Sequence, residues 1–133
     1  MLTRVTISTF DSMTKKNSYS SILQDFARPL LNSKDTDEEF LRKMKVIEII
    51  WNYCIAKKFR MPVFEEIDKI ITNQHKKHPE MKLVFDMFLE LKRTEFNNYN
   101  NYIIKIELRE NSDGVKTFYV ESADPLQNKI KGI

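Results

Sequence analysis

The chain has 133 residues, of which 41% are hydrophobic and 31% are charged, and its formal net charge is +3 at pH 7. This length predicts one domain with its own core, and no apolar run reaches the 18 or so residues that cross a membrane. The only glycines are Gly114 and Gly132, which excludes the glycine-rich phosphate loops of P-loop, Rossmann and kinase folds. The excess of basic residues lies in residues 1–34 without a dense tract, so nucleic-acid binding has weak support.

The termini and the cysteine content indicate where the protein resides. A single cysteine, Cys54, leaves no disulfide framework, and residues 1–7 lack the continuous apolar segment of a signal peptide. We therefore expect a cytoplasmic protein. Residues 1–17 predict either a short strand, because apolar and polar side chains alternate at the start, or a loose polar segment. Residues 124–133 predict a polar tail.

Residues 18–123 are expected to form a single α+β domain, in which about four helices precede an antiparallel hairpin. The first helix is capped by Ser18 or Ser20 and has apolar residues at helical spacing. Pro29 lies near the end of this helix. Its ring and its missing N–H predict a kinked last turn or an extended exit.

The second helix begins at a capping box, in which the side chains of Thr36 and Glu39 accept hydrogen bonds from each other's backbone N–H groups. It runs to about Lys57 and is apolar on two faces, which predicts a central helix with Trp51 as a core anchor. A narrow polar strip consists of Lys45, Glu48 and Asn52. We interpret this strip either as a solvated edge or as a polar cleft beside the hairpin.

Pro62 and Pro79 are each typical of the first residue of a helix, so a third helix is expected from residue 62 to 75 and a fourth from 79 to 96. The fourth helix has two apolar faces. One carries Leu83, Val84, Met87, Phe88 and Leu91, and the other carries Phe85, Leu89 and Phe96. Its polar strip predicts a ladder of ion pairs, or else carboxylates that bind a metal or share a proton. The strip consists of Lys82, Asp86, Glu90 and Arg93.

After an asparagine-rich turn the apolar pattern has a period of two, which predicts two strands of a hairpin. The register that places Leu108 opposite Phe118 leaves residues 112–114 as the loop, with Ile104 on the buried face. Such a three-residue loop requires a left-handed last residue, and Gly114 occupies that position. The hairpin is expected to pack on the helices, because two strands alone are not stable.

No catalytic residue, metal ligand set or cofactor is expected. A zinc site needs three or four ligands, and His75 and His78 stand alone between lysines in what the sequence predicts to be a solvated turn. Cys54 is expected to be a small buried residue, because no histidine or helix N-terminus is placed to activate it.

These patterns favour a non-enzymatic protein-interaction module that binds a protein partner or forms a homodimer, with no membrane contact. One alternative is a small-ligand binder or enzyme that uses polar residues of the second and fourth helices. The candidate binding residues are Lys45, Glu48, Asn52, Asp86, Glu90 and Arg93. Another alternative is a nucleic-acid-binding protein that stacks bases on hairpin aromatics. Those aromatics are Tyr99, Tyr102, Phe118 and Tyr119.

Three segments, residues 25–31 (Asp-Phe-Ala-Arg-Pro-Leu-Leu), 50–52 (Ile-Trp-Asn) and 92–96 (Lys-Arg-Thr-Glu-Phe), precede the hairpin. Together they resemble a group of small bacterial proteins, some of which end in a cysteine-rich zinc-binding tail of the SEC-C type. This chain lacks such a tail. The resemblance covers about residues 20–122 and implies the same order of helices and hairpin. It implies a bacterial protein and no particular activity. The interaction module is expected to belong to a bacterial or phage accessory system.

Overall fold

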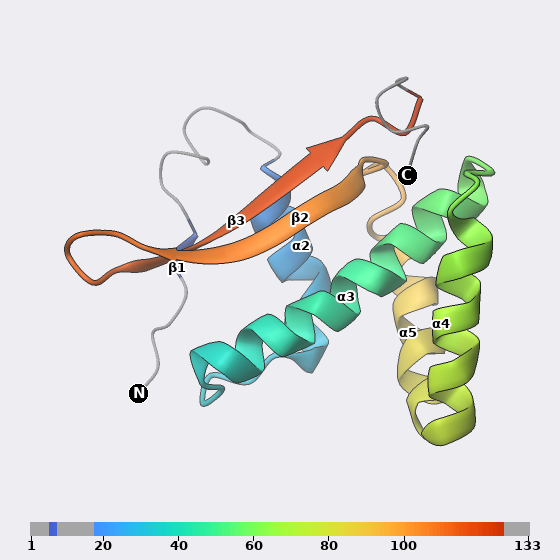
Figure 1. Ribbon diagram of the computed structural model, residues 1–133, viewed down its shortest axis with the longest axis horizontal. Coiled ribbons are helices and arrows are strands. Elements are labelled where there is room, and N and C mark those ends of the chain that lie inside the picture. The colour runs from blue at the N-terminus through green and yellow to red at the C-terminus, as the bar shows by residue number, and fades with distance from the viewer. Residues whose placement is uncertain (1–5, 8–17, 127–133) are drawn as a thin grey trace. The chain divides into compact units, whose positions relative to one another are not determined.

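A computed structural model describes residues 6–7 and 18–126 of the protein (Figure 1). The elements in chain order are β1 (Thr6–Ile7), α2 (Tyr19–Ala27), the 3-10 helix η1 (Arg28–Leu30), α3 (Asp37–Lys58), α4 (Phe64–Lys77), α5 (Met81–Thr94), β2 (Tyr102–Glu110) and β3 (Lys116–Ala123). The predicted α+β fold, with four helices followed by a hairpin, is confirmed. The short N-terminal strand is present as β1. The rest of residues 1–17, and residues 127–133 of the expected tail, lie outside the described residues.

Local sequence signals set the end of α2 and the start of α3. Pro29 lies in η1, where the chain tightens before it becomes extended at Leu31 (φ −84°, ψ 148°). At the start of α3, the Thr36 N–H donates to Glu39 Oε1 (2.8 Å) and the Glu39 N–H donates to Thr36 Oγ1 (3.1 Å). The predicted capping box is therefore confirmed.

The prolines before α4 and α5 lie outside these helices. The sequence places Pro62 and Pro79 at first helical positions, but α4 begins at Phe64 and α5 at Met81. A tight turn precedes α4, in which the Phe64 N–H donates to the Met61 carbonyl (3.0 Å). A proline has the backbone φ that such a turn needs, so each proline starts the turn instead of the helix.

The described residues form two compact units, and α3 contributes to both. The first unit contains the chain up to Glu48 together with Ile103–Ser122, and the second contains Ile49–Tyr102 and the chain from Ala123. Buried apolar side chains of α3 occur in both units. They include Phe40, Met44 and Ile47 in the first, and Ile50, Trp51 and Ile55 in the second. These side chains lie on one face of the helix, which is therefore buried along both halves of α3.

In the first unit the hairpin packs on the N-terminal half of α3. The ring of Phe118 on β3 meets the ring of Phe40 edge to face, with 5.4 Å between centroids. Lys116 pairs with Asp37 at the start of the helix. The strand order is β1-β3-β2, and β1 runs parallel to β3 with Ile7 opposite Phe118.

The predicted hairpin loop is confirmed by its hydrogen bonds. The Asn111 N–H donates to the Val115 carbonyl (3.0 Å), and the Gly114 N–H donates to the Asn111 carbonyl (3.0 Å). Gly114 has a φ of 81°, as a three-residue loop with a final left-handed residue requires.

Substitution of Gly114 by alanine is expected to lower the free energy of unfolding by about 1–2 kcal/mol, because a Cβ disfavours positive φ. A Cβ there would meet only Glu110 Oε2 at 3.8 Å, so the cost comes from the backbone conformation and not from a clash. Gly114→Asn is the control, since asparagine tolerates this conformation better. Urea unfolding of the three proteins measures the effect, and equal midpoints for wild type and Gly114→Ala would contradict the explanation.

The start of β2 departs from the predicted alternation. Ile104 is 38% exposed, whereas its neighbour Ile103 is 1% exposed. The prediction that Ile104 faces the core is therefore wrong, although Ile106 on the same face is buried as expected. The period of two gives the two faces of a strand but not which face is covered at each end.

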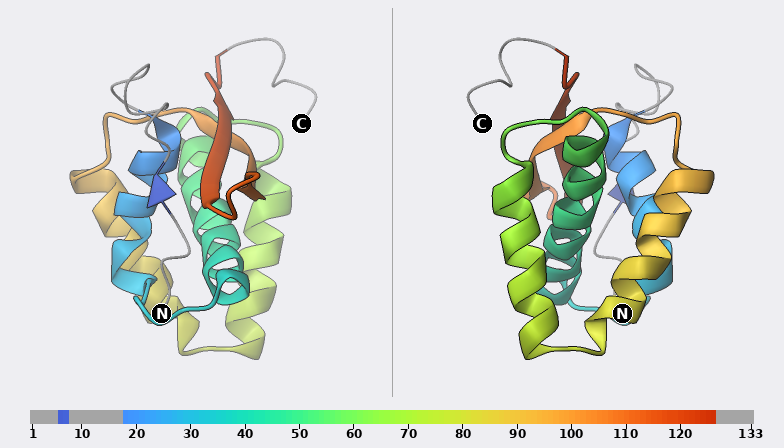
Figure 2. Two further views of the ribbon diagram at one scale, coloured as in Figure 1. Left: turned by 90° about the vertical axis from the view of Figure 1, so that its left-hand side faces the viewer. Right: turned by 90° about the vertical axis from the view of Figure 1, so that its right-hand side faces the viewer.

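In the second unit, aromatic contacts join α3, α4 and α5. The ring of Tyr53 on α3 lies 5.2 Å from that of Phe64 on α4 and 5.3 Å from that of Phe85 on α5. The turn before Met81 reverses the chain, so that α4 and α5 run in opposite directions (Figure 2). This cluster holds α5 by the face that carries Phe85 and Phe88.

Candidate functional site

The outward side of α5 carries an apolar surface, which we call the α5 apolar face. Leu83 is 78% exposed, Met87 43% and Val84 36%. Phe85 and Phe88 of the same helix are buried. The predicted division into two faces is therefore corrected: Phe88, expected on the face of Leu83 and Met87, is buried together with Phe85, and the other three remain exposed. Exposed apolar residues that cluster in this way are typical of interaction surfaces.

The polar strip of α5 consists of ion pairs within the helix. Lys82 Nζ lies 3.2 Å from Asp86 Oδ2, and Arg93 Nε donates to Glu90 Oε1 (3.1 Å). All four side chains are half or more exposed. The candidates Asp86, Glu90 and Arg93 thus occupy the solvated ladder that is one of the two interpretations of their spacing.

The polar strip of α3 divides into different environments. Lys45 is exposed, Glu48 is half-buried and Asn52 is buried. Burial raises the pKa of the Glu48 carboxyl, and the positive charge of Lys45 opposes this shift. Because Asn52 is buried, it does not belong to a solvated edge.

A buried lysine, which the sequence interpretation missed, lies in the second unit. Lys92 on α5 is only 5% exposed. Its Nζ donates to the Phe96 carbonyl (2.8 Å) and lies 4.7 Å from the centre of the Trp51 ring. Burial lowers the pKa of this amine to about 8, and the positive charge of Lys58 acts in the same direction. Its spacing from Phe85 and Phe88, seven and four residues, is the signal that could have placed it on the buried face.

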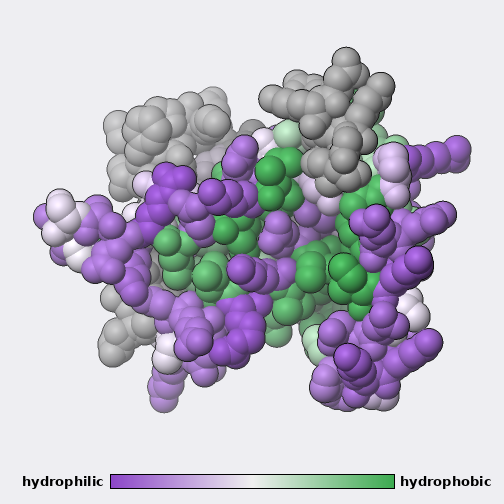
Figure 3. Space-filling view, in the orientation of Figure 1, coloured by the Kyte–Doolittle hydropathy of each residue, from purple (hydrophilic) through white to green (hydrophobic). Residues whose placement is uncertain are grey.

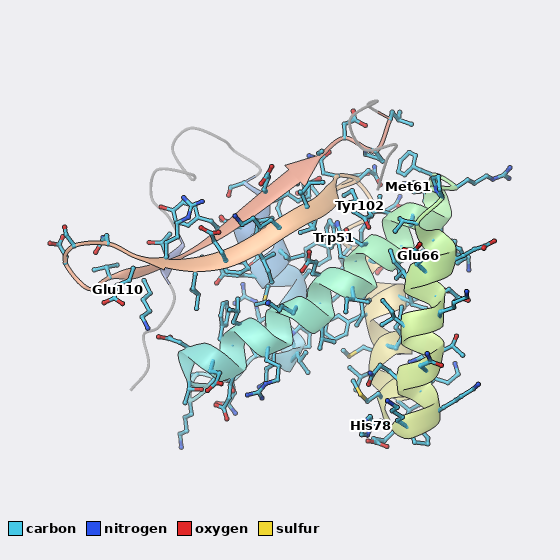
Figure 4. The ribbon with its side chains drawn as sticks, in the orientation of Figure 1. Trp51, Met61, Glu66, His78, Tyr102 and Glu110 are labelled. Atoms are coloured by element: carbon cyan, nitrogen blue, oxygen red, sulfur yellow. The ribbon has the colours of Figure 1, made fainter. Side chains whose placement is uncertain are left out.

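Trp51 projects from α3 (Figure 4) and anchors the connection between α5 and β2. It is fully buried, its Nε1 donates to the Asn101 carbonyl (2.9 Å), and its ring meets that of Phe96 edge to face. Lys58 holds the same connection through Asn100 Oδ1 (2.9 Å). The expected role of Trp51 as a core anchor is confirmed.

The cysteine and the two histidines lie in three different environments. Burial raises the pKa of the Cys54 thiol to about 11, so it is a neutral thiol at pH 7. His75 packs on the ring of Phe85, and His78 lies 3.7 Å from Glu80. Among residues 6–7 and 18–126, no three His, Cys, Asp or Glu side chains are close enough together to hold a metal ion.

Comparison with known proteins gives no relative. The chain matches no family model, no curated protein and no solved structure. The resemblance to small bacterial proteins stays a prediction. Within the described residues, no helix is long and apolar enough to span a membrane.

Proposed function

We propose that the protein is a non-enzymatic protein-interaction module that binds a partner protein through the α5 apolar face. The observation that carries this proposal is the exposure of Leu83, Val84 and Met87 on a helix whose other side is already anchored in the core. These side chains are not needed for the packing of α5, and exposure of a clustered apolar surface to water is unfavourable.

The charges around this face indicate the chemistry of the partner. Lys82 is paired with Asp86, and Glu90 with Arg93, so the polar side of α5 offers little net charge. A partner surface with an apolar centre and few charges fits such a face. Because little of the binding energy would come from charge, we expect affinity to change little with salt concentration.

The two alternative functions have less support. Tyr102 and Phe118, two of the four aromatics that base stacking would use, are buried. The ring of Tyr119 is covered by Arg109 at 4.2 Å. For a ligand-binding site, the carboxylates of α5 are exposed and already paired with bases of their own helix.

A photo-crosslinker tests the interaction proposal. Val84 is replaced by benzoylphenylalanine in the full chain, crosslinked proteins are identified from the native host, and the partner is purified. Its affinity is then measured by calorimetry for wild type, Met87→Glu and Val115→Glu. Met87→Glu should weaken binding about tenfold or more, as charges at the centre of an apolar interface do. Val115→Glu is the matched control, because Val115 is an equally exposed apolar residue that directly follows the hairpin loop.

Three results would contradict the proposal. The first is a partner that binds Met87→Glu as tightly as wild type. The second is an affinity that falls steeply with salt. The third is crosslinking only between copies of the chain itself, which would make the α5 apolar face a self-association surface.

A further inference from the structure

Strand β2 forms an edge of the sheet. It has nine residues, contains no proline, and has β3 as its neighbour on one side. Along its other side, no strand of the described residues pairs with it. Such an edge presents unpaired N–H and C=O groups that can pair with another strand.

The hairpin loop determines which residues of β2 present those groups. The hydrogen bond from the Asn111 N–H to the Val115 carbonyl fixes the pairing of the two strands. Counted along an antiparallel ladder, every second residue from Asn111 points its backbone groups toward β3. The backbone groups of the intervening residues Ile104, Ile106 and Leu108 therefore point toward the open edge.

The charges of β2 alternate along the strand between these residues. Lys105 Nζ lies 3.0 Å from Glu107 Oε1, and Arg109 pairs with the same carboxylate. Lys105 and Arg109 are more than half exposed. The end of the hairpin near the loop is accordingly hydrophilic (Figure 3). The side chains are thus accessible to a neighbouring strand.

A second β2 strand in antiparallel orientation fits this pattern. If the twofold axis passes through Ile106, Lys105 of each copy lies opposite Glu107 of the other. A twofold axis at Lys105 or Glu107 would place that residue opposite its own copy, so that like charges would face each other. The backbone groups of both residues also point toward β3 and not toward the open edge. Ile106 is also the midpoint of Tyr102–Glu110, so pairing about it uses the whole strand. The direction of the backbone groups, the pairing of opposite charges and the length of the strand therefore all select an axis at Ile106.

We propose that two copies of the chain form a dimer through their β2 edges, antiparallel and with the twofold axis at Ile106. The two three-stranded sheets then join into one continuous sheet. This inference goes beyond the proposed function, since it concerns a different surface. A closed dimer also covers the β2 edge of each copy.

Charge reversal tests the dimer and its axis by sedimentation velocity on the full chain. Lys105→Glu and Glu107→Lys each place like charges opposite each other twice across the axis, and each should weaken the dimer about tenfold or more. An equimolar mixture of the two variants restores opposite charges at both places and should recover dimers. Circular dichroism checks that every variant is folded.

Arg109→Glu is the matched control, because it reverses a charge on the same strand that faces no charge across an axis at Ile106. It should leave the dimer within about twofold of wild type, whereas an axis at Leu108 would make it the most disruptive change. The proposal is overturned if the wild-type chain is monomeric at high micromolar concentration, if the mixture does not recover dimers, or if Arg109→Glu dissociates them. Dissociation by Met87→Glu alone would instead place self-association on α5.

Discussion

Replacement of Trp51 by alanine is expected to lower the free energy of unfolding by about 3–5 kcal/mol, the largest effect of any substitution considered. The side chain is fully buried, so its removal leaves a cavity in the core of the second unit. It also removes the donor to the Asn101 carbonyl and the ring that faces Phe96 and Lys92. Each of these contacts holds the connection between α5 and β2.

Urea unfolding followed by far-UV circular dichroism measures this effect, because Trp51 is the only tryptophan and its fluorescence is lost in the variant. Trp51→Phe is the control. It keeps an aromatic ring but not the N–H, so a smaller loss of about 1–2 kcal/mol is expected. If alanine and phenylalanine cost the same, the cavity would not be the main cause.

Removal of the charge of Lys92 should change how stability depends on pH. The amine has a pKa of about 8 in the folded protein and about 10.5 when unfolded. Between these values the unfolded chain binds more protons than the folded one, so stability should rise with pH. The rise amounts to roughly 3 kcal/mol for a shift of this size. Below pH 8 both states are charged and this contribution to the pH dependence vanishes.

Lys92→Met tests this effect, because methionine fills the space of the lysine stem without the charge. At pH 7 the variant loses the bond to the Phe96 carbonyl and the contact with Trp51, but it also loses the cost of a buried charge. We expect a net change within about 1 kcal/mol. Unfolding free energies of both proteins from pH 7 to 10.5 measure the difference. Parallel curves would show that the amine is not shifted.

Lys92→Ala separates charge from packing. It should lose the same pH dependence as the methionine variant but be less stable at every pH by about 2 kcal/mol, because the apolar stem of the lysine also packs in the core. If Lys92→Ala were as stable as Lys92→Met, the apolar stem of the lysine would contribute little to stability.

For the functional surfaces, sequence patterns identified the elements but not the exposed face. Spacing alone showed that the fourth helix has more apolar surface than one face, but it placed Phe88 with Leu83 and Met87, whereas Phe88 is buried together with Phe85. Which face is exposed depends on the packing of α5 against Tyr53, which puts Phe85 inside and leaves Leu83 outside. Spacing places Lys92 on the same face as Phe85 and Phe88, but its residue type argues against burial, because lysine is almost never fully buried.

The sequence by itself determined the features that a few neighbouring residues control. Thr36 and Glu39 form the capping box, Pro29 tightens the end of α2, and Gly114 closes a three-residue loop. In each case the hydrogen bond or the backbone angle lies within one turn of chain, so no distant residue is needed to set it.

The tertiary structure decided what is buried. It buried Asn52, and at the start of β2 it buried Ile103 and left Ile104 exposed. Burial is set by the element that packs against a face, and that element is distant in sequence. A pattern of apolar residues shows that a face can be covered, but only the packing shows which faces remain open for a partner.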